Sequence, residues 1–360
     1  MVLRIGAIGY GNIAQRRHFP QLRALAGRAE LVAIAGRDGP RLAACAARFG
    51  VSRVYDDPAA MLADPEIDAV LVLTPPDSHA RFAEAAIAAG KHVMVEKPLV
   101  PSLAEAERLR AAVRARGAVT FYPLPHVATA EHGLVSRLVA AGGVGAVTSV
   151  ENHRGHRGPT HASWFYDRSL AGGGVLIDLG IYQLTAMATL FGPAVSMTSA
   201  CATRYPTRVM DDGSVVRPDV EDIALLTLML ADRTAISVNV NWTSAPSHVA
   251  TRARVVAFGR EGTLYFGSND GFVHVHRPDG DYGTLPEGAE AVLFDGLACR
   301  RVAYAVTAGP PSIVEAFVAR IEAGDRSTRA LDIQLHVMDI IAAAYDPGNA
   351  ARAVVLPVRW

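Results

Sequence analysis

Residues 2–14, VLRIGAIGYGNIA, decide the fold. The stretch opens with an apolar run, VLRIGAI, which predicts a strand buried on both faces. Gly9 and Gly11 follow in the pattern G-x-G-x-x-A, although a register that starts at Gly6 is also possible. Glycines permit a tight turn and a close approach of backbone to a pyrophosphate, and a helix that begins at the turn offers free N–H groups. The stretch therefore predicts the first βα turn of a dinucleotide-binding domain; the alternative is a glycine turn that serves packing alone.

Strand-like and helix-like segments alternate after this turn. Such alternation predicts βαβ units and a parallel sheet, in which ligands bind beyond the C-terminal ends of the strands. The apolar strand segments are 29–36, 68–75 and 91–98, and the helical segments between and after them are 40–50, 79–90 and 102–117.

The pattern changes after about residue 120. Four apolar or alternating segments between residues 220 and 267 predict a second, open sheet. The chain is thus expected to be an α/β protein with two domains. The first is a Rossmann NAD(P)-binding domain over residues 1–121. The second, over residues 122–360, is an α+β domain that contains this open sheet.

Composition narrows the class of protein. The 360 residues are 50% hydrophobic and 19% charged, with 35 basic and 35 acidic side chains. This balance is typical of a soluble globular protein and argues against a nucleic-acid binder steered by net charge. The three cysteines show no CxxC spacing, and no apolar run reaches the ~20 residues of a membrane helix, so a cytoplasmic protein without membrane or nucleic-acid partners is expected.

The end of the second predicted strand bears on cofactor choice. An acidic residue there would accept from the adenosine ribose, whereas an arginine would meet a 2′-phosphate. Arg37 comes first, with Arg41 one helical turn on, and Asp38 is the competing candidate. Because Arg37 comes before Asp38, the sequence favours NADP(H) over NAD(H). The alternative is that Arg37 and Asp38 form a surface ion pair, which contributes little to stability.

A lysine ends the strand in HVMVEKPL, residues 92–99. In a parallel sheet this places Lys97 beside whatever binds at the C-terminal edge. The alternative is a lysine paired with a nearby carboxylate at a solvated strand end, because charged strand ends are only probabilistic markers of sites.

An aspartate and a tyrosine follow a glycine run in GGGVLIDLGIY, residues 172–182. Asp178 and Tyr182 are spaced i, i+4, so on a helix they share one face and could exchange protons at one point. Capping or packing roles are the alternative for both. His153, His156 and His161 precede them, but their irregular spacing favours polar loop residues near a substrate over metal ligands, and no metal is expected.

Three motifs occur in order: GYGNIA (9–14), VMVEKP (93–98) and GGGVLIDLGIY (172–182). Together they resemble the glucose–fructose oxidoreductase, inositol dehydrogenase and rhizopine-catabolism (Gfo/Idh/MocA) family, in the branch with a DxGxY motif. LTPPDSHA (73–80) is similar to its segment under the nicotinamide, and WFYD (164–167) fits the same branch. The resemblance covers nearly the whole chain.

The resemblance implies roles for individual residues. Lys97 is expected to touch the substrate hydroxyl and the nicotinamide ribose, Tyr182 to be the general acid and base, and Asp178 to orient the substrate or Lys97. The catalytic residues it implies are Lys97, Asp178 and Tyr182. The substrate-binding residues are Lys97, Trp164, Asp178 and Tyr182. The cofactor-binding residues are Gly9, Gly11, Asn12, Ile13, Arg37, Thr74, Pro75, His79, Glu96 and Lys97.

The function implied is hydride transfer between NADP(H) and a carbinol or carbonyl carbon of a sugar, polyol or related alcohol. The resemblance also implies that the domain over residues 122–360 serves substrate binding and oligomerisation through a large, mostly antiparallel sheet. The exposed face of this sheet would otherwise be a large apolar patch, which usually marks an interface, so a homodimer or homotetramer is expected. Two alternatives remain open: an NAD-assisted glycoside hydrolase, and a non-catalytic nucleotide-sensing regulator on the same fold.

Overall fold

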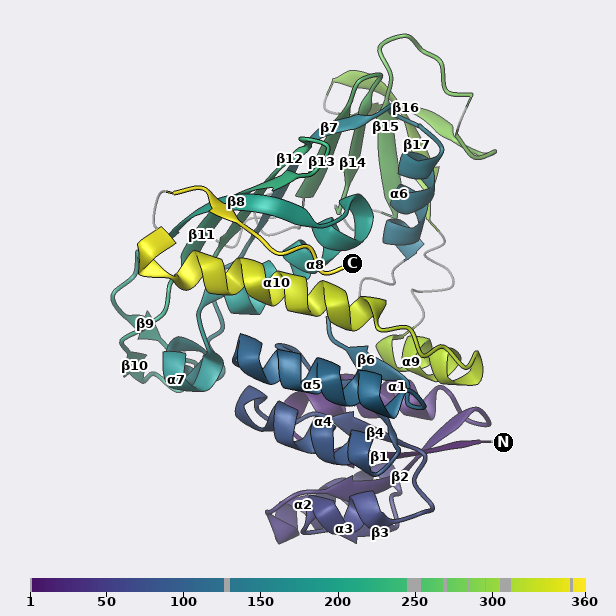
Figure 1. Cartoon of the computed structure of the whole chain (residues 1–360), viewed down its shortest axis with the longest axis vertical. Helices are drawn as coiled ribbons and strands as arrows, with labels where there is room; N and C mark the ends of the chain where they lie inside the picture. The colour runs from purple at the N-terminus through teal and green to yellow at the C-terminus, as the bar shows by residue number, and fades with distance from the viewer. Residues whose placement is uncertain are drawn as a thin grey trace. The chain divides into compact units, whose positions relative to one another are not determined.

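The computed structural model divides the chain into two compact units, each continuous in space but not in sequence (Figure 1). The first unit joins Met1–His126 to Pro311–Leu335, and the second joins Val127–Pro310 to His336–Trp360. A single division between residues 121 and 122 does not describe this return of the chain to the first unit. The structure describes residues 2–125, 130–244, 254–267, 271–283, 285–294, 296–304, 312–349 and 352–360.

The first unit contains a six-stranded parallel sheet in the order β3-β2-β1-β4-β5-β6, which confirms the predicted Rossmann arrangement. The sequence forms these strands because each core position is an apolar residue; all four residues of β4 are buried. The strands are β1 (Leu3–Ile8), β2 (Ala29–Ala35), β3 (Arg53–Tyr55), β4 (Ala69–Val72), β5 (His92–Val95) and β6 (Phe121–Pro123).

Helices connect these strands, and several begin at a capping side chain. Asp57, Ser102 and Ser312 each accept a hydrogen bond from an amide of the first helical turn. The first helical run contains a π-helical turn, η1. The helical segments are η1 (Ala14–His18), α1 (Phe19–Arg23), α2 (Gly39–Phe49), α3 (Pro58–Ala63), η2 (Pro76–Ser78), α4 (His79–Ala88), α5 (Leu103–Arg116) and α9 (Ile313–Glu322).

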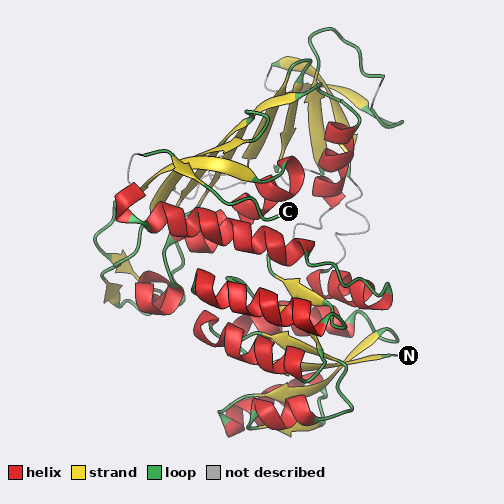
Figure 2. Cartoon of the chain, viewed as in Figure 1, coloured by secondary structure: helices red, strands yellow, loops and turns green. Residues whose placement is uncertain are grey.

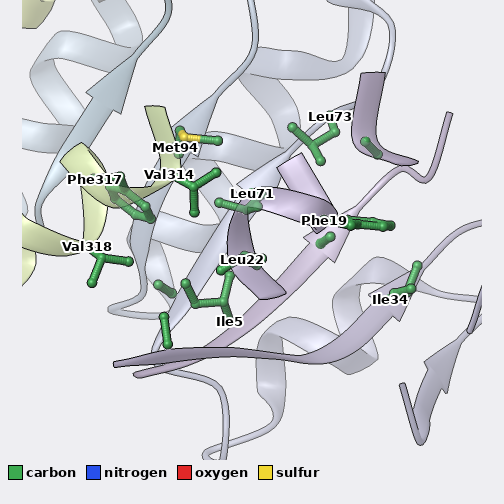
Figure 3. Packing of buried hydrophobic residues seen from close by; sticks show 14 of the residues in the cluster. Ile5, Phe19, Leu22, Ile34, Leu71, Leu73, Met94, Val314, Phe317 and Val318 are labelled. Atoms are coloured by element: carbon green, nitrogen blue, oxygen red, sulfur yellow. The ribbon is translucent and has the colours of Figure 1, made fainter. Parts of the chain in front are cut away.

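A hydrophobic cluster explains why α9, from late in the chain, belongs to the first unit (Figure 3). Phe317 of α9 is fully buried and packs near the Tyr122 ring, with ring centroids 5.9 Å apart. Burying one large apolar side chain stabilises a fold by roughly 1.5–3 kcal/mol. The labelled members of the cluster are Ile5, Phe19, Leu22, Ile34, Leu71, Leu73, Met94, Val314, Phe317 and Val318.

The second unit is built on a ten-stranded sheet in the order β16-β17-β15-β14-β13-β7-β12-β11-β8-β18. Only the β7–β12 pair is parallel, so the predicted large, mostly antiparallel sheet is confirmed. A separate two-stranded ribbon pairs β9 with β10. The strands are β7 (Val147–Gly155), β8 (Ala194–Ala202), β9 (Arg208–Val209), β10 (Val215–Val216), β11 (Ile223–Leu230), β12 (Ala235–Asn241), β13 (Arg254–Gly259), β14 (Thr263–Phe266), β15 (Phe272–His276), β16 (Glu290–Phe294), β17 (Leu297–Ala303) and β18 (Val354–Val355).

One face of this sheet packs against a helical segment, η4 followed by α8 (Figure 2). Side chains alternate between the faces, so Val238 and Val240 of β12 are buried whereas Ser237 is exposed. The helical segments of the unit are α6 (Ala130–Ala140), η3 (Ser163–Tyr166), α7 (Arg168–Ala171), η4 (Leu176–Gly180), α8 (Ile181–Phe191), η5 (Pro347–Asn349) and the second part of α10 (Arg329–Tyr345), which begins in the first unit.

One helical run among the described residues, Arg168–Phe191, is long and apolar enough to cross a membrane by length and composition. Its apolar window is 67% buried inside the protein, which is typical of a core helix.

Candidate functional site

The glycine turn after β1 has the geometry that its sequence requires. Gly9 has φ +96°, and a Cβ there would lie 2.7 Å from the carbonyl oxygen of Leu73 at the end of β4. Glycine is therefore needed both for the backbone conformation and for the close approach of two strand ends. No heavy atom lies within 4 Å of a Cβ built on Gly11, so this backbone is open to a ligand.

The residues after the turn lie where a dinucleotide would contact the start of the helix. Asn12 and Ile13 are exposed, and Ile13 is 40% exposed although it is apolar. Exposed apolar surface at a helix N-terminus next to an open glycine suits a bound cofactor. The open Gly11 backbone and these exposed residues fit a dinucleotide.

No local sequence pattern predicts the contact between Tyr10 and Gly36. The Tyr10 hydroxyl donates to the main-chain oxygen of Asp38 at 3.1 Å. A Cβ on Gly36 would lie 2.3 Å from the Tyr10 ring, so glycine lets the ring cover the end of β2. The turn and the end of β2 are thereby held together.

The two candidates for the ribose end of the cofactor have different surroundings. The Asp38 carboxylate caps α2, because it accepts from the Arg41 amide at 3.2 Å, and it lies 3.7 Å from the Arg41 guanidinium. Arg37 is exposed just after β2, and its side chain has no hydrogen bond or ion pair with another described residue. Asp38 is thus occupied by helix capping, whereas Arg37 is available.

The loop after β4 carries Thr74, Pro75 and His79. Pro75 is exposed, and Thr74 accepts from the Ser78 hydroxyl at 2.8 Å. His79 is fully buried: Nδ1 lies 2.8 Å from the Pro98 oxygen and Nε2 lies 2.8 Å from the Thr74 oxygen. Both nitrogens therefore contact main-chain carbonyls, and the structure favours an indirect role in which His79 joins the loops after β4 and β5.

Glu96 and Lys97 follow β5. Glu96 is buried, its Oε1 lies 2.8 Å from Nε2 of the fully buried His18, and its Oε2 accepts from the Lys97 amide at 2.7 Å. Burial opposes ionisation of Glu96, but the hydrogen bonds from His18 and Lys97 and the nearby positive charge hold its pKa below the ordinary value. The carboxylate thus fixes the backbone that carries the half-buried Lys97, and direct cofactor contact by Glu96 stays a prediction.

In the second unit, Asp178 and Tyr182 lie one turn apart on the run formed by η4 and α8. Asp178 sits in the π-helical turn, a feature that is frequent at functional sites. Both side chains are half-buried. The structure therefore places them on one helical run, as the spacing predicts.

Two residues at the end of β7 face this pair. The guanidinium carbon of Arg154 lies 5.4 Å from the centroid of the Tyr182 ring, and His156 Nε2 lies 4.0 Å from Asp178 Oδ2. Sequence reasoning placed His156 near a substrate but gave Arg154 no role. Arg154 reaches Tyr182 because β7 pairs with β12 and η4 packs against β12.

The remaining predicted residues lie on the segment between β7 and η4. Trp164 is 39% exposed on η3 and stacks on Phe165 with ring centroids 3.9 Å apart; Phe165 also contacts the His161 ring. Substrate binding by Trp164 stays a prediction. Among the described residues, no group of three or more His, Cys, Asp or Glu side chains could hold a metal ion.

Two sequence families match the chain. Residues 3–123 match the family described as an oxidoreductase family with an NAD-binding Rossmann fold, and residues 133–265 match the GFO/IDH/MocA C-terminal domain. The chain belongs to the Gfo/Idh/MocA oxidoreductase family. The order of the two matches reproduces the division between the parallel and the antiparallel sheets.

Curated relatives include members of the Gfo/Idh/MocA family that reduce sugars. The dTDP-3,4-didehydro-2,6-dideoxy-α-D-glucose 3-reductase of Streptomyces antibioticus is 35% identical over 57% of this chain and 62% of its own length. The 1,5-anhydro-D-fructose reductase of Ensifer adhaerens is 32% identical over 50% of this chain and 54% of its own length. The match thus spans little more than half of these relatives.

Solved structures share the fold over the whole chain. Levoglucosan dehydrogenase in complex with NADH superposes with a TM-score of 0.84 at 21% identity, covering 99% of this chain and 100% of that one. A 3-ketoreductase from Actinomadura kijaniata in complex with TDP-benzene and NADP has a TM-score of 0.72 at 22% identity, covering 97% and 98%. At these identities the likeness establishes the Gfo/Idh/MocA fold alone.

Proposed function

We propose that this chain is an enzyme that transfers a hydride between a nicotinamide cofactor and a carbinol or carbonyl carbon of a sugar, polyol or related alcohol. When bound, the cofactor supplies the hydride, and the protein supplies binding, orientation and proton transfer. Membership of the Gfo/Idh/MocA family supports the reaction class.

The observation that carries the proposal is the group of polar side chains around Tyr182. The phenol lies one helical turn after Asp178, and the Arg154 guanidinium lies over its ring. A cation over the ring stabilises negative charge as it develops on the phenolic oxygen. In this proposal Tyr182 donates a proton to the substrate oxygen during reduction and removes it during oxidation.

Asp178 and Lys97 complete the proposed machinery. Asp178 orients the substrate hydroxyl, and His156 at 4.0 Å helps to orient the carboxylate. Lys97 stabilises oxyanion character on the substrate, since a positive charge placed where negative charge develops lowers the barrier. The buried Glu96 supports this role because it fixes the Lys97 amide and adds a negative charge beside the ammonium.

NADP(H) is the proposed preferred cofactor. The pyrophosphate would contact the open backbone at Gly11 and the start of the following helix, near Asn12 and Ile13. The 2′-phosphate would meet Arg37, because the alternative residue, Asp38, is engaged in capping α2. Relatives of similar fold bind NADH in one case and NADP in another, which is compatible with either cofactor in the family.

The assembly proposed is a homodimer or homotetramer that uses the exposed face of the large sheet, in the cytoplasm and without nucleic-acid or membrane partners. The exposed positions of β11 and β12 alternate between apolar and small polar side chains, such as Leu225 at 45% exposure and Ser237. A face of this kind suits contact with a second copy. Light scattering at micromolar protein tests the assembly.

A substrate panel tests the function. Purified protein is mixed with sugars, sugar ketones and polyols, each with NADP(H) and with NAD(H), and the nicotinamide absorbance is followed together with aryl release from aryl glycosides. Net cofactor oxidation or reduction supports the proposal. Aryl release without net redox change would identify the glycoside hydrolase instead, and cofactor binding without turnover of any kind would identify the regulator.

A further inference from the structure

The glycine run before η4 packs against two specific residues. A Cβ on Gly173 would lie 2.2 Å from the Tyr345 hydroxyl oxygen, and one on Gly174 would lie 1.9 Å from the main-chain oxygen of Glu221. A side chain at Gly173 would meet Tyr345 at the end of α10, and one at Gly174 would meet the backbone of Glu221, two residues before β11. The glycines are therefore required for a close contact, not only for a turn.

Three consecutive amides at the start of the helical run all donate to Glu221. The Gly174 amide lies 3.1 Å from both carboxylate oxygens, the Val175 amide donates to the Glu221 main-chain oxygen at 3.1 Å, and the Leu176 amide donates to Oε1 at 3.0 Å. The first amides of a helix have no partner within the helix, and a negative charge there is favoured by the helix dipole. One residue thus accepts hydrogen bonds from three amides at the buried start of this helix.

The Glu221 carboxylate is well compensated for a buried charge. Its residue is 4% exposed, the Tyr345 hydroxyl donates to Oε1 at 2.8 Å, and Arg168 Nη2 lies 3.6 Å from Oε2. Burial and the adjacent carboxylate raise the pKa of Tyr345, so its hydroxyl stays protonated and able to donate. Removing one partner of such a group leaves other polar atoms buried without partners, which is strongly destabilising locally.

The contacts of Glu221 with the amides of residues 174–176, here called the anchor, lie within two residues of Asp178 in the proposed site. The Asp178 amide donates at 3.0 Å to the main-chain oxygen of Gly174, whose own amide is bound by Glu221. We propose that Glu221 is a positioning residue: it holds the start of the helix so that Asp178 and Tyr182 meet the substrate in a fixed geometry. The part of this inference that concerns turnover rests on the proposed function; the anchoring itself does not.

The test compares four variants with the wild type. Glu221→Ala removes the whole anchor, and Glu221→Gln keeps the shape and one acceptor oxygen but loses the charge. Tyr345→Phe removes one partner and leaves the contacts with the helix. Glu287→Gln, at an exposed position between β15 and β16, is the matched control for loss of a carboxylate.

Steady-state kinetics give the first result. Misplacement of reacting groups by about 1 Å costs up to about 100-fold in rate. Glu221→Ala is therefore expected to lower kcat about 10- to 100-fold, with Glu221→Gln in between and the cofactor KM unchanged. The matched control should stay near the wild-type kcat, and Tyr345→Phe, which loses one hydrogen bond to Glu221 but none between Glu221 and the helix, should lower kcat less than Glu221→Ala does. A Glu221→Ala variant with wild-type kcat would overturn the positioning role.

Amide hydrogen exchange gives a second result that needs no turnover. In the wild type the amides of Gly174 and Leu176 should exchange slowly, and in Glu221→Ala they should exchange faster, while amides in the middle of α8 keep their protection. Unchanged protection of Gly174 and Leu176 would overturn the anchor even if kcat falls. If the wild type turns over no substrate, the proposed function fails, and exchange still decides whether Glu221 holds the helix. If Glu221→Ala does not fold, both measurements are made on Glu221→Gln instead.

Discussion

Arg154 lies over the ring of Tyr182, with its guanidinium carbon 5.4 Å from the ring centroid, although the first residue is on strand β7 and the second on helix α8. A cation in this position is attracted to the ring face and stabilises charge on the phenolic oxygen. The contact links the C-terminal end of an interior strand of the sheet to the residue that we assign as acid and base.

Replacing Arg154 by Gln is expected to lower kcat/KM without unfolding the protein. A cation–π contact contributes about 0.5–2 kcal/mol, and because 1.36 kcal/mol corresponds to tenfold in rate, the expected loss is roughly 2- to 30-fold. Arg157→Gln, an exposed arginine in the same segment, is the matched control and should match the wild type. Equal kcat/KM values for both variants would remove Arg154 from the mechanism.

Replacing Tyr182 by Phe keeps the ring and deletes the hydroxyl. If Tyr182 transfers the proton, kcat should fall about 100-fold or more at neutral pH, because general acid–base catalysis typically contributes that much. The ring contact with Arg154 remains, so the unfolding temperature should change little. An unchanged kcat with a raised KM would show instead that the hydroxyl only binds substrate.

Glu96→Gln gives a prediction about pH and stability. The carboxylate has a pKa below its ordinary value because hydrogen bonds from His18 and the Lys97 amide outweigh burial. A depressed pKa in the folded state stabilises the protein fully above the unfolded-state value of about 4.3, and this stabilisation is lost as pH falls through the folded-state pKa. Urea unfolding of wild type and variant should therefore differ most at neutral pH and converge in acid. A difference that does not vary with pH would contradict this account.

Arg37→Ala tests the choice of cofactor. A hydrogen bond to a charged group contributes roughly 1.5–3 kcal/mol, so kcat/KM for NADPH should fall by about ten- to a hundredfold. NADH lacks the 2′-phosphate and serves as the internal control. Tighter binding of NAD(H) by the wild type, with no effect of the substitution on NADP(H), would assign the ribose contact to Asp38 despite its capping role.

The parts of the fold that sequence reasoning recovered are set by neighbouring residues. The Gly9 turn, the buried strands and the spacing of Asp178 and Tyr182 each depend on a few adjacent positions, and local pattern predicts them. The family resemblance, borne out by two matches over the chain, came from three such local motifs in order.

Long-range contacts could not be predicted in the same way. His18 meets Glu96, Arg154 meets Tyr182, and Glu221 meets Gly174 only after strands pair and helices pack. One partner of each pair belongs to a local motif, but His18, Arg154 and Glu221 do not, so no local pattern predicts the pairs. The return of Pro311–Leu335 to the first unit could not be predicted for the same reason, because it depends on the packing of Phe317 in the core of that unit. His79 lies in a motif that predicts a cofactor contact, and its buried ring lies between two main-chain carbonyls, so the cofactor contact stays a prediction.

Transfer of a labelled hydride tests the central claim most directly. The protein is incubated with a carbonyl substrate from the panel and with nicotinamide cofactor that carries deuterium at the transferable position, and the product is analysed by mass spectrometry. Deuterium is expected on the new carbinol carbon, with the label lost from the cofactor in equal amount and the rate sharply reduced in Tyr182→Phe. A product without deuterium, formed while the cofactor keeps its label, would contradict net hydride transfer and with it the proposed function.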